Sequence, residues 1–166
     1  DTVNDVTILA NAKNTGHATG HGVTVGGIAV GGMIVETNLG KGTGSDEVIA
    51  EVGNNAAIDD ARNVIITARS TDELFAEGES AGGGLISVTG ADVSNTTDQS
   101  AAVRIGSGAD IFAQAITLTA DHLQNVDGQG ESVNFGLAAG GGAIVSNVVL
   151  GKATIDVGSN AELEAF

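Results

Sequence analysis

The sequence predicts an all-β protein, and more specifically a right-handed parallel β-solenoid of three repeats of about 52 residues. A nine-residue phrase that recurs at a fixed spacing is the first observation behind this prediction. The second is a strict alternation of apolar and polar residues, which is typical of strands. The third is the composition of 26 glycines and no proline, because a proline inside a central strand removes a backbone hydrogen-bond donor.

The recurring phrase marks the period of the chain. It is clearest at 157–165, where it reads Val-Gly-Ser-Asn-Ala-Glu-Leu-Glu-Ala; it recurs at 105–113 and has a looser copy at 52–60. The copies start 53 and 52 residues apart. The repeats therefore run approximately over 6–61, 62–114 and 115–166, within a single domain at 1–166.

Two sets of apolar strands keep this period and are expected in every repeat. Their ranges are 6–10, 64–68 and 116–120 for the first set, and 27–30, 84–87 and 136–139 for the second, Gly-rich set. The first repeat is longer by about five residues, which we place around 40–45. An insertion of this kind is expected to form a loop on the flank of a repeat.

The number of coils per repeat follows less directly from the period. About 52 residues is long for one coil of three short strands, so we expect two coils per repeat and about six coils in all. One large coil per repeat is the alternative. The segments 23–35 and 137–149 are apolar or small on both faces, which predicts strands that are buried on both faces and lie close to another layer.

The repeat register also predicts which outward side chains stack on one another. Glu51, Arg104 and Asp156 occupy one position in successive repeats. A cation then lies between two anions, which avoids repulsion between like charges on neighbouring strands.

A second column is predicted from the asparagines that close the Gly-rich runs. These residues are Asn38, Asn95 and Asn147. They are expected to form an asparagine ladder whose amides bond from coil to coil. The alternative is that each asparagine only tolerates a tight turn.

The charge excludes some classes of partner. A formal charge of −15, from 21 acidic and 6 basic side chains, disfavours nucleic acid and anionic membrane surfaces. The uncharged run at 132–151 has the length of a membrane span, but its five glycines make a poor helix, so we expect sheet and no membrane insertion. The absence of cysteine excludes disulfides and thiolate metal sites.

The recurring phrases resemble a known family. The nine-residue phrase, then Ile-Thr-Leu-Thr-Ala, then Gly-Leu-Ala-Ala-Gly-Gly-Gly-Ala-Ile-Val-Ser-Asn, is similar to repeats of large secreted bacterial exoproteins. These are the leukotoxin-like filamentous adhesins and the relatives of filamentous haemagglutinin. The resemblance covers essentially the whole chain. It implies a β-helical stalk, an extracellular or cell-surface location, adhesive or filament-forming work, and no catalytic residues to transfer.

Two motifs suggest metal binding. The segment 42–48 matches the core of the calcium β-roll repeat, which makes Asp46 and Glu47 candidate calcium ligands, although one isolated copy lacks the neighbouring turn that would share the ion. His17 and His21 would share a face of a strand, but they are too far apart to bind one tetrahedral zinc unless the chain bends. We expect no other cofactor.

The expected function is therefore structural. The chain has no Tyr or Trp to stack on sugars and spreads its acids along its length, so we expect no enzyme of the β-helical lyase type. We expect a non-catalytic segment of an extracellular adhesin or filament. The alternative is a self-assembling filament or surface-layer subunit, joined head to tail and responsive to calcium. Neither end has a polar cap, so the expected partners are flanking repeats or other copies, with a host or neighbouring cell surface beyond them.

Overall fold

The structure is a computed structural model that describes residues 4–40 and 46–166. In these residues every regular element is a β-strand, so the all-β prediction is confirmed. The strands are β1 (Val6–Val25), β2 (Ile28–Leu39), β3 (Asp46–Val52), β4 (Ala57–Gly83), β5 (Ile86–Ile105), β6 (Asp110–Phe135), β7 (Ala138–Val157) and β8 (Glu162–Ala165).

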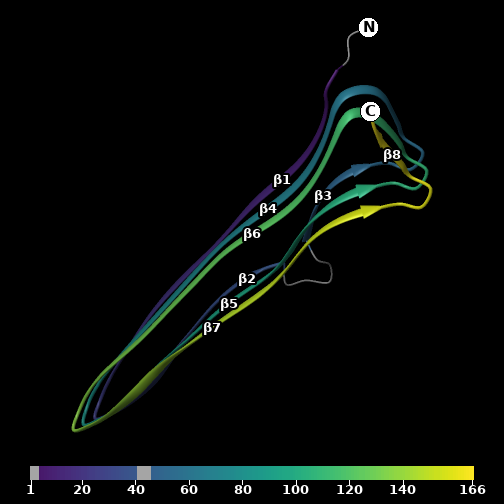
Figure 1. Ribbon diagram of the computed structural model, residues 1–166. Helices are drawn as coiled ribbons and strands as arrows, with labels where there is room; N and C mark the ends of the chain where they lie inside the picture. Colours follow the sequence, from purple (N-terminus) through teal and green to yellow (C-terminus); the bar gives the residue numbers. More distant parts are fainter. Residues whose placement is uncertain (1–3, 41–45) are drawn as a thin grey trace.

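The strands form two parallel sheets, which we call the first and second walls. The first wall has the order β1-β4-β6-β8. In the second wall, β5 pairs with β2, β3 and β7. Figure 1 shows the walls as two long layers that converge at a narrow end, where residues 25–28, 83–86 and 135–138 connect them, and diverge toward a wide end near both termini.

Each repeat makes one pass along each wall. Val6 pairs with Val64 and Val64 pairs with Ile116, so paired residues are a whole repeat apart. The expectation of two coils per repeat, and hence about six coils, is wrong, because it needs pairs about half a repeat apart. The long strands β4 and β6 take up the length that seemed too great for one coil of short strands.

The alternation of side chains forms the interior between the walls. In β4, Val64, Ile66 and Ala68 are fully buried, whereas the intervening residues face outward. Ala102 differs from the expected pattern, because it lies on the outward side but is buried. Its paired neighbours Ile49 and Thr154 are larger and flank its methyl group on both sides.

At the wide end, the recurring phrase forms the turns that connect the second wall to the first. The third residue of each turn has a positive φ, of 54° at Asn55, 67° at Gly108 and 56° at Asn160. Glycine and asparagine tolerate this conformation best, which explains why the phrase alternates between them. The turns stack on one another through backbone bonds, such as Asp110 N to Ala56 O at 2.8 Å and Glu162 N to Ala109 O at 2.8 Å.

The first repeat differs from the others in two places. One extra residue sits in a bulge between Ile58 and Ala61, where Asp60 has a φ of 54°. The insertion expected around 40–45 lies, apart from Gly40, outside the described residues.

The main hydrophobic core lies near the wide end. Its larger buried members are Val52, Val64, Ile66, Val103, Ile105 and Ile111. A smaller cluster, formed by Val35, Ala76 and Val93, lies farther toward the narrow end. Between the two clusters the interior is polar, and this section contains the cluster described below.

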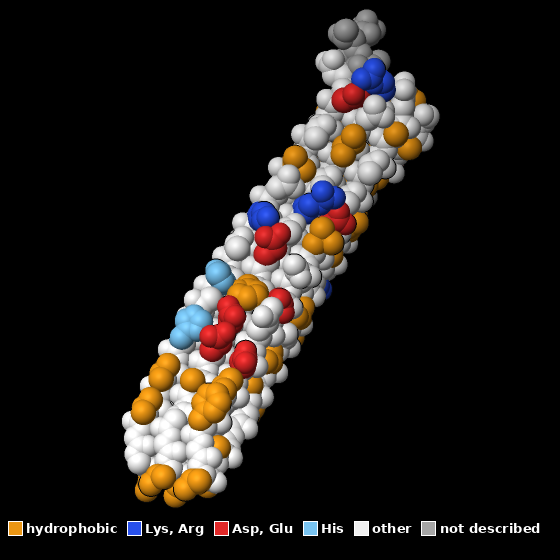
Figure 2. Space-filling model, turned by 90° about the vertical axis from the view of Figure 1, so that its left-hand side faces the viewer, with side chains coloured by type: hydrophobic (Ala, Val, Ile, Leu, Met, Phe, Trp, Pro, Cys, Tyr) orange, Lys and Arg blue, Asp and Glu red, His pale blue; other side chains and the backbone are white. Residues whose placement is uncertain are grey.

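The Gly-rich segments are not buried on both faces as expected. Their inner faces do lie close to the opposite wall, since a Cβ on Gly141 would be only 2.6 Å from Ser132 Oγ of β6. Their outer faces are exposed, however, as at Val25 (80%) and Ile28 (71%). The close layer is therefore the other wall of the same chain. Figure 2 shows exposed apolar side chains at the narrow end.

The uncharged run at 132–151 is sheet, as expected. Its residues lie in β6 and β7 apart from the connection at the narrow end. Among the described residues, none forms a helix with the length and apolar character needed to cross a membrane.

Candidate functional site

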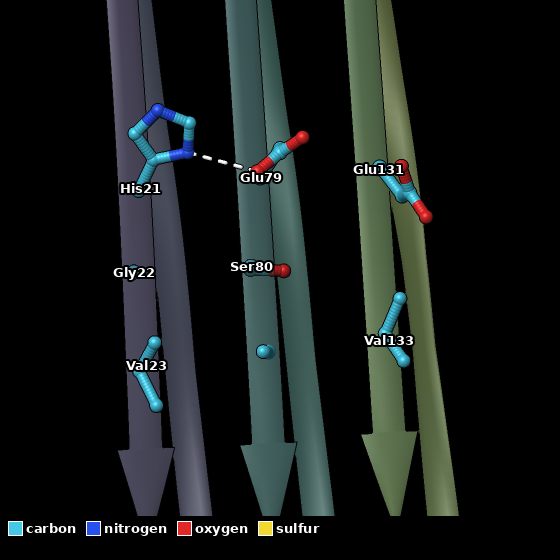
Figure 3. A pocket seen from close by; sticks show the side chains of 8 residues that line it. His21, Gly22, Val23, Glu79, Ser80, Glu131 and Val133 are labelled. Carbon is cyan, nitrogen blue, oxygen red and sulfur yellow. Dashed lines mark hydrogen bonds and ion pairs between the residues drawn. The ribbon is translucent and has the colours of Figure 1, made fainter.

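The charged side chains of the first wall form rows that run across its strands. His21 of β1 pairs in register with Glu79 of β4, which pairs with Glu131 of β6. The His21 Nδ1 and Glu79 Oε2 atoms are 2.9 Å apart. Figure 3 shows this row beside a shallow hollow that continues toward Val23 and Val133. The row is thus an exposed imidazole–carboxylate pair with a second carboxylate next to it.

The histidines of β1 do not form a metal site. His17 stacks on Phe75, with ring centroids 5.0 Å apart, whereas His21 bonds to Glu79. Each histidine therefore interacts with the next strand rather than with the other histidine. The described residues contain no cluster of three His, Cys, Asp or Glu side chains that could hold a metal ion.

The candidate calcium ligands are only partly described. Glu47 accepts a hydrogen bond from the Arg104 guanidinium, an ion pair that satisfies part of its carboxylate. The side chain of Asp46 and residues 42–45 of the motif lie outside the description. Calcium binding at Asp46 and Glu47 stays a prediction.

The charged column of the second wall has the expected register. Glu51 pairs with Arg104, and Arg104 pairs with Asp156. The ion pair of Arg104 is nevertheless with Glu47, which lies four residues before Glu51 on β3. Arg104 therefore forms its ion pair with the diagonal neighbour Glu47 rather than with Glu51, its partner in the register.

The asparagine column is correct for two of its three members. Asn95 Nδ2 donates to Asn147 Oδ1 at 2.9 Å and also to the Asp127 carbonyl at 2.9 Å. Asn38 was wrongly placed, because it pairs with Thr96 and points to the exposed side. Thr37 takes the inner position instead, and its hydroxyl donates to Asn95 Oδ1.

Substitution of Asn95 tests whether its side chain stabilises the fold through ladder hydrogen bonds or only tolerates a turn. Asn95→Ala should lower the free energy of unfolding by about 2–3 kcal/mol, because it leaves the buried Thr37 hydroxyl without its acceptor. Asn38→Ala, on the exposed side, should change it by less than about 0.5 kcal/mol. Denaturant midpoints of the two variants give the comparison, and equal losses would contradict the assignment.

A buried polar cluster lies between the two hydrophobic clusters. Its centre is Asp72, which is fully buried. The Asp72 carboxylate lies 2.8 Å from His122 Nε2 through Oδ2, and it accepts from Thr97 Oγ1 at 3.2 Å and from Asn14 Nδ2 at 3.0 Å. All three repeats contribute, since Asn14, Asp72 and His122 lie on β1, β4 and β6.

The geometry gives this cluster a structural role. The carboxylate is enclosed, and the hydroxyl of the neighbouring Ser70 is directed at Asp72 at 3.5 Å rather than at the imidazole. A buried carboxylate is costly unless it is paired and hydrogen-bonded, and here it has several partners. The cluster was not predicted from the sequence, although the alternation places Ser70 and Asp72 on the same inner face as Ala68.

A salt bridge at the wide end shifts the pKa of one carboxyl. Arg62 binds Asp5 through two bonds, from Nε at 2.9 Å and from Nη2 at 2.6 Å, and Asn63 Nδ2 adds a third at 2.8 Å. The Arg62 guanidinium, followed by the Asn63 amide, lowers the pKa of Asp5 from 3.8 to about 2. The pair links the first repeat to the second.

We expect Arg62→Gln to return the pKa of Asp5 toward 3.8. A depressed folded-state pKa stabilises the fold above pH 3.8, and this contribution is lost as the pH falls through about 2. The stability difference between wild type and Arg62→Gln should therefore shrink over that interval. Carboxyl carbon NMR titration of Asp5 is the measurement, and an unchanged pKa in the variant would contradict the assignment.

No family model, curated protein or solved structure matches this chain significantly.

Proposed function

We propose that the two walls are opposite sides of one flattened, right-handed parallel β-solenoid with one coil per repeat. We further propose that this chain is a structural, non-catalytic segment of an extracellular bacterial adhesin or filament. Pairing of residues one repeat apart on both walls supports the coil. The right hand follows from the strong preference of parallel strand connections for that handedness.

The observation that carries this proposal is the in-register stacking of successive repeats. Strands of both walls pair over most of their length, and the turns at both ends add backbone bonds, such as Gly84 N to Phe135 O at 3.1 Å. These bonds run along the direction in which the repeats stack. A load along that axis is then shared by many backbone bonds, which suits a stalk.

The surface and the sequence resemblance support the same role. The chain carries a net charge of −15, which keeps an elongated molecule soluble and separates neighbouring rods. The resemblance to filamentous exoproteins supports an extracellular or cell-surface location. The buried position of Asp72 and His122, an acid–base pair 2.8 Å apart, supports a non-catalytic protein.

A second candidate function is a self-assembling filament or surface-layer subunit. It is favoured by β7, whose inner side chains are exposed although their counterparts in β5 are buried. A calcium-responsive version would depend on Asp46 and Glu47. Thermal unfolding with calcium and with a chelator tests that version, since a midpoint that does not change on chelation would exclude it.

Single-molecule pulling tests the stalk role. Handles attached near the two termini would load the repeats along their stacking axis. We expect a distinct force peak for rupture of the stacked repeats. Extension without a peak would contradict the proposed mechanical role.

A further inference from the structure

The third repeat leaves an uncovered edge on both walls. Among the described strands, β7 pairs only with β5, and β6 has β8 beside it only over 110–113. Core side chains are exposed there, as at Val145 (42%) and Ile155 (47%), whereas the paired Val93 and Val103 of β5 are fully buried. An unpaired edge with an apolar inner face is a template for another strand.

The first repeat has the opposite edge. Within the described part of the chain, β1 pairs only with β4, and β2 pairs only with β5. Both edges therefore run along the full length of the walls. They face opposite directions along the stacking axis, so one edge of a molecule can meet the other edge of a second molecule.

The two edges of the first wall carry different ionisable groups. β1 contains no carboxylate, and its outward side chains include Lys13, His17 and His21. The outward side chains of β6 between 117 and 135 contain no Lys, Arg or His and include Asp121, Asp127 and Glu131. Figure 2 shows the histidines along one long margin of this wall. Lys13 pairs with Glu73, and Asp121 pairs with Arg69, within the same chain. The histidines of one edge and the remaining carboxylates of the other are complementary, which favours pairing between the edges.

We propose that a second copy of this chain docks its β1–β2 edge on the β6–β7 edge, head to tail. This inference rests on the proposed function, because it assumes the stacked coils, and it adds that their partner is a second copy of the chain. Continuing the observed register places the second copy's His17 beside Asp127 and its His21 beside Glu131. The docking also covers the exposed core side chains of β7.

The pair of His21 and Glu79 is the intramolecular precedent for this junction. In both cases a histidine of β1 lies beside a glutamate of the adjacent strand in the same row. His21 uses Nδ1 for Glu79, and Figure 3 shows its other ring nitrogen pointing away from that carboxylate. One imidazole can therefore bond to Glu79 in its own chain and to Glu131 of its neighbour.

The second wall adds further complementary positions. Continued register places Asn147 beside the second copy's Thr37, the same pairing that Thr37 makes with Asn95 within the chain. It also places Lys152 beside the second copy's Glu47. Asp156 would meet Glu51, which is unfavourable, but both side chains are exposed and screened by salt.

Sedimentation velocity of the purified chain over a range of concentrations tests the proposal. We expect concentration-dependent association into rods that electron microscopy shows lengthening along the stacking axis. The edge variant His17→Glu/His21→Glu should weaken this association by about tenfold or more, because carboxylates would then face Asp127 and Glu131. The opposite-edge variant Asp127→Lys/Glu131→Lys should weaken it similarly.

Mixing the two edge variants gives the sharpest test. The glutamate variant alone sets carboxylates against carboxylates, and the lysine variant alone sets lysines against histidines. In an equimolar mixture the glutamates of one variant meet the lysines of the other, while the alternate junctions keep the wild-type histidine–carboxylate pairs, so assembly should be restored. Thr67→Glu/Thr71→Glu is the matched control, since it adds the same charge to the central strand β4 and should assemble like wild type. Circular dichroism confirms that each variant is folded.

A wild-type chain that stays monomeric throughout, or assembly that ignores both edge variants, would overturn the proposal. Failure of the mixture to assemble would also overturn it. These outcomes are distinct from failure of the proposed function. A monomeric chain that still shows a force peak would support the stalk role and contradict docking of a second copy. A chain with no force peak would contradict the proposed mechanical role.

Discussion

Asp72→Ala should lower the free energy of unfolding by at least about 3 kcal/mol. The substitution removes the shared partner of His122, Thr97 and Asn14 in the interior, where His122 has only 6% of its side chain exposed. It also leaves a cavity where the carboxylate was. For a chain of this size the loss corresponds to a fall in the midpoint of thermal unfolding on the order of 10 °C.

Asp92→Ala is the matched control for this substitution. Asp92 lies on the exposed side of β5, so the same chemical change should alter stability by less than about 0.5 kcal/mol. Chemical denaturation of both variants, compared with wild type, gives the two differences. Equal losses at Asp72 and Asp92 would show that the buried cluster does not stabilise the fold.

Gly84→Ala should destabilise the narrow end by about 2 kcal/mol or more. A Cβ at this position would lie 2.0 Å from the carbonyl oxygen of Gly26 in the preceding repeat. Because that obstacle is backbone, the stacked turns themselves would have to separate. Gly136 has the same relation to the Gly84 carbonyl, at 2.5 Å, so the restriction recurs from repeat to repeat.

The adjacent Gly83→Ala provides the control. A Cβ on Gly83 would meet nothing within 4 Å, and its φ lies outside the left-handed region. This variant should be neutral, or more stable by up to about 1 kcal/mol through the lower entropy of the unfolded chain. Thermal unfolding distinguishes the two, and similar behaviour of both variants would contradict the close stacking at the narrow end.

Much of the fold could be predicted because the repeat fixes the phase of the strands. Aligning the copies of one phrase was enough to place Glu51 beside Arg104 and Arg104 beside Asp156. The alternation along 101–105 likewise puts Val103 and Ile105 on one face, and both are buried in the structure. Both inferences use only local spacing, which the structure preserves.

The number of coils could not be predicted from the same spacing. Glycines at 16, 20 and 22 look like breaks within β1, but this strand continues through them. Gly20 is needed for a different reason, since a Cβ there would lie 2.7 Å from Val35 Cγ2 on the other wall. A glycine required by close packing between walls and a glycine required by a turn look the same in a sequence.

The interior site could not be predicted because its members are far apart in the chain. Asp72 and His122 are separated by 50 residues and do not occupy the same repeat position, since His122 pairs in register with Ser70. Asn38 failed for a related reason. The register of β2 against β5 is a constant 58 residues, which places Thr37 beside Asn95, whereas the match of Asn38 to Asn95 assumes a spacing of 57.

The most direct test of one coil per repeat is the proximity of residues one repeat apart. The chain has no cysteine, so Thr67→Cys/Thr119→Cys, on paired strands of the first wall, can be labelled with pyrene at two positions only. Neighbouring strands are about 4.8 Å apart, so we expect strong excimer fluorescence in dilute solution. Thr67→Cys/Ser94→Cys, half a repeat apart and on opposite walls, should give none. Excimer emission from the second pair but not the first would contradict the account.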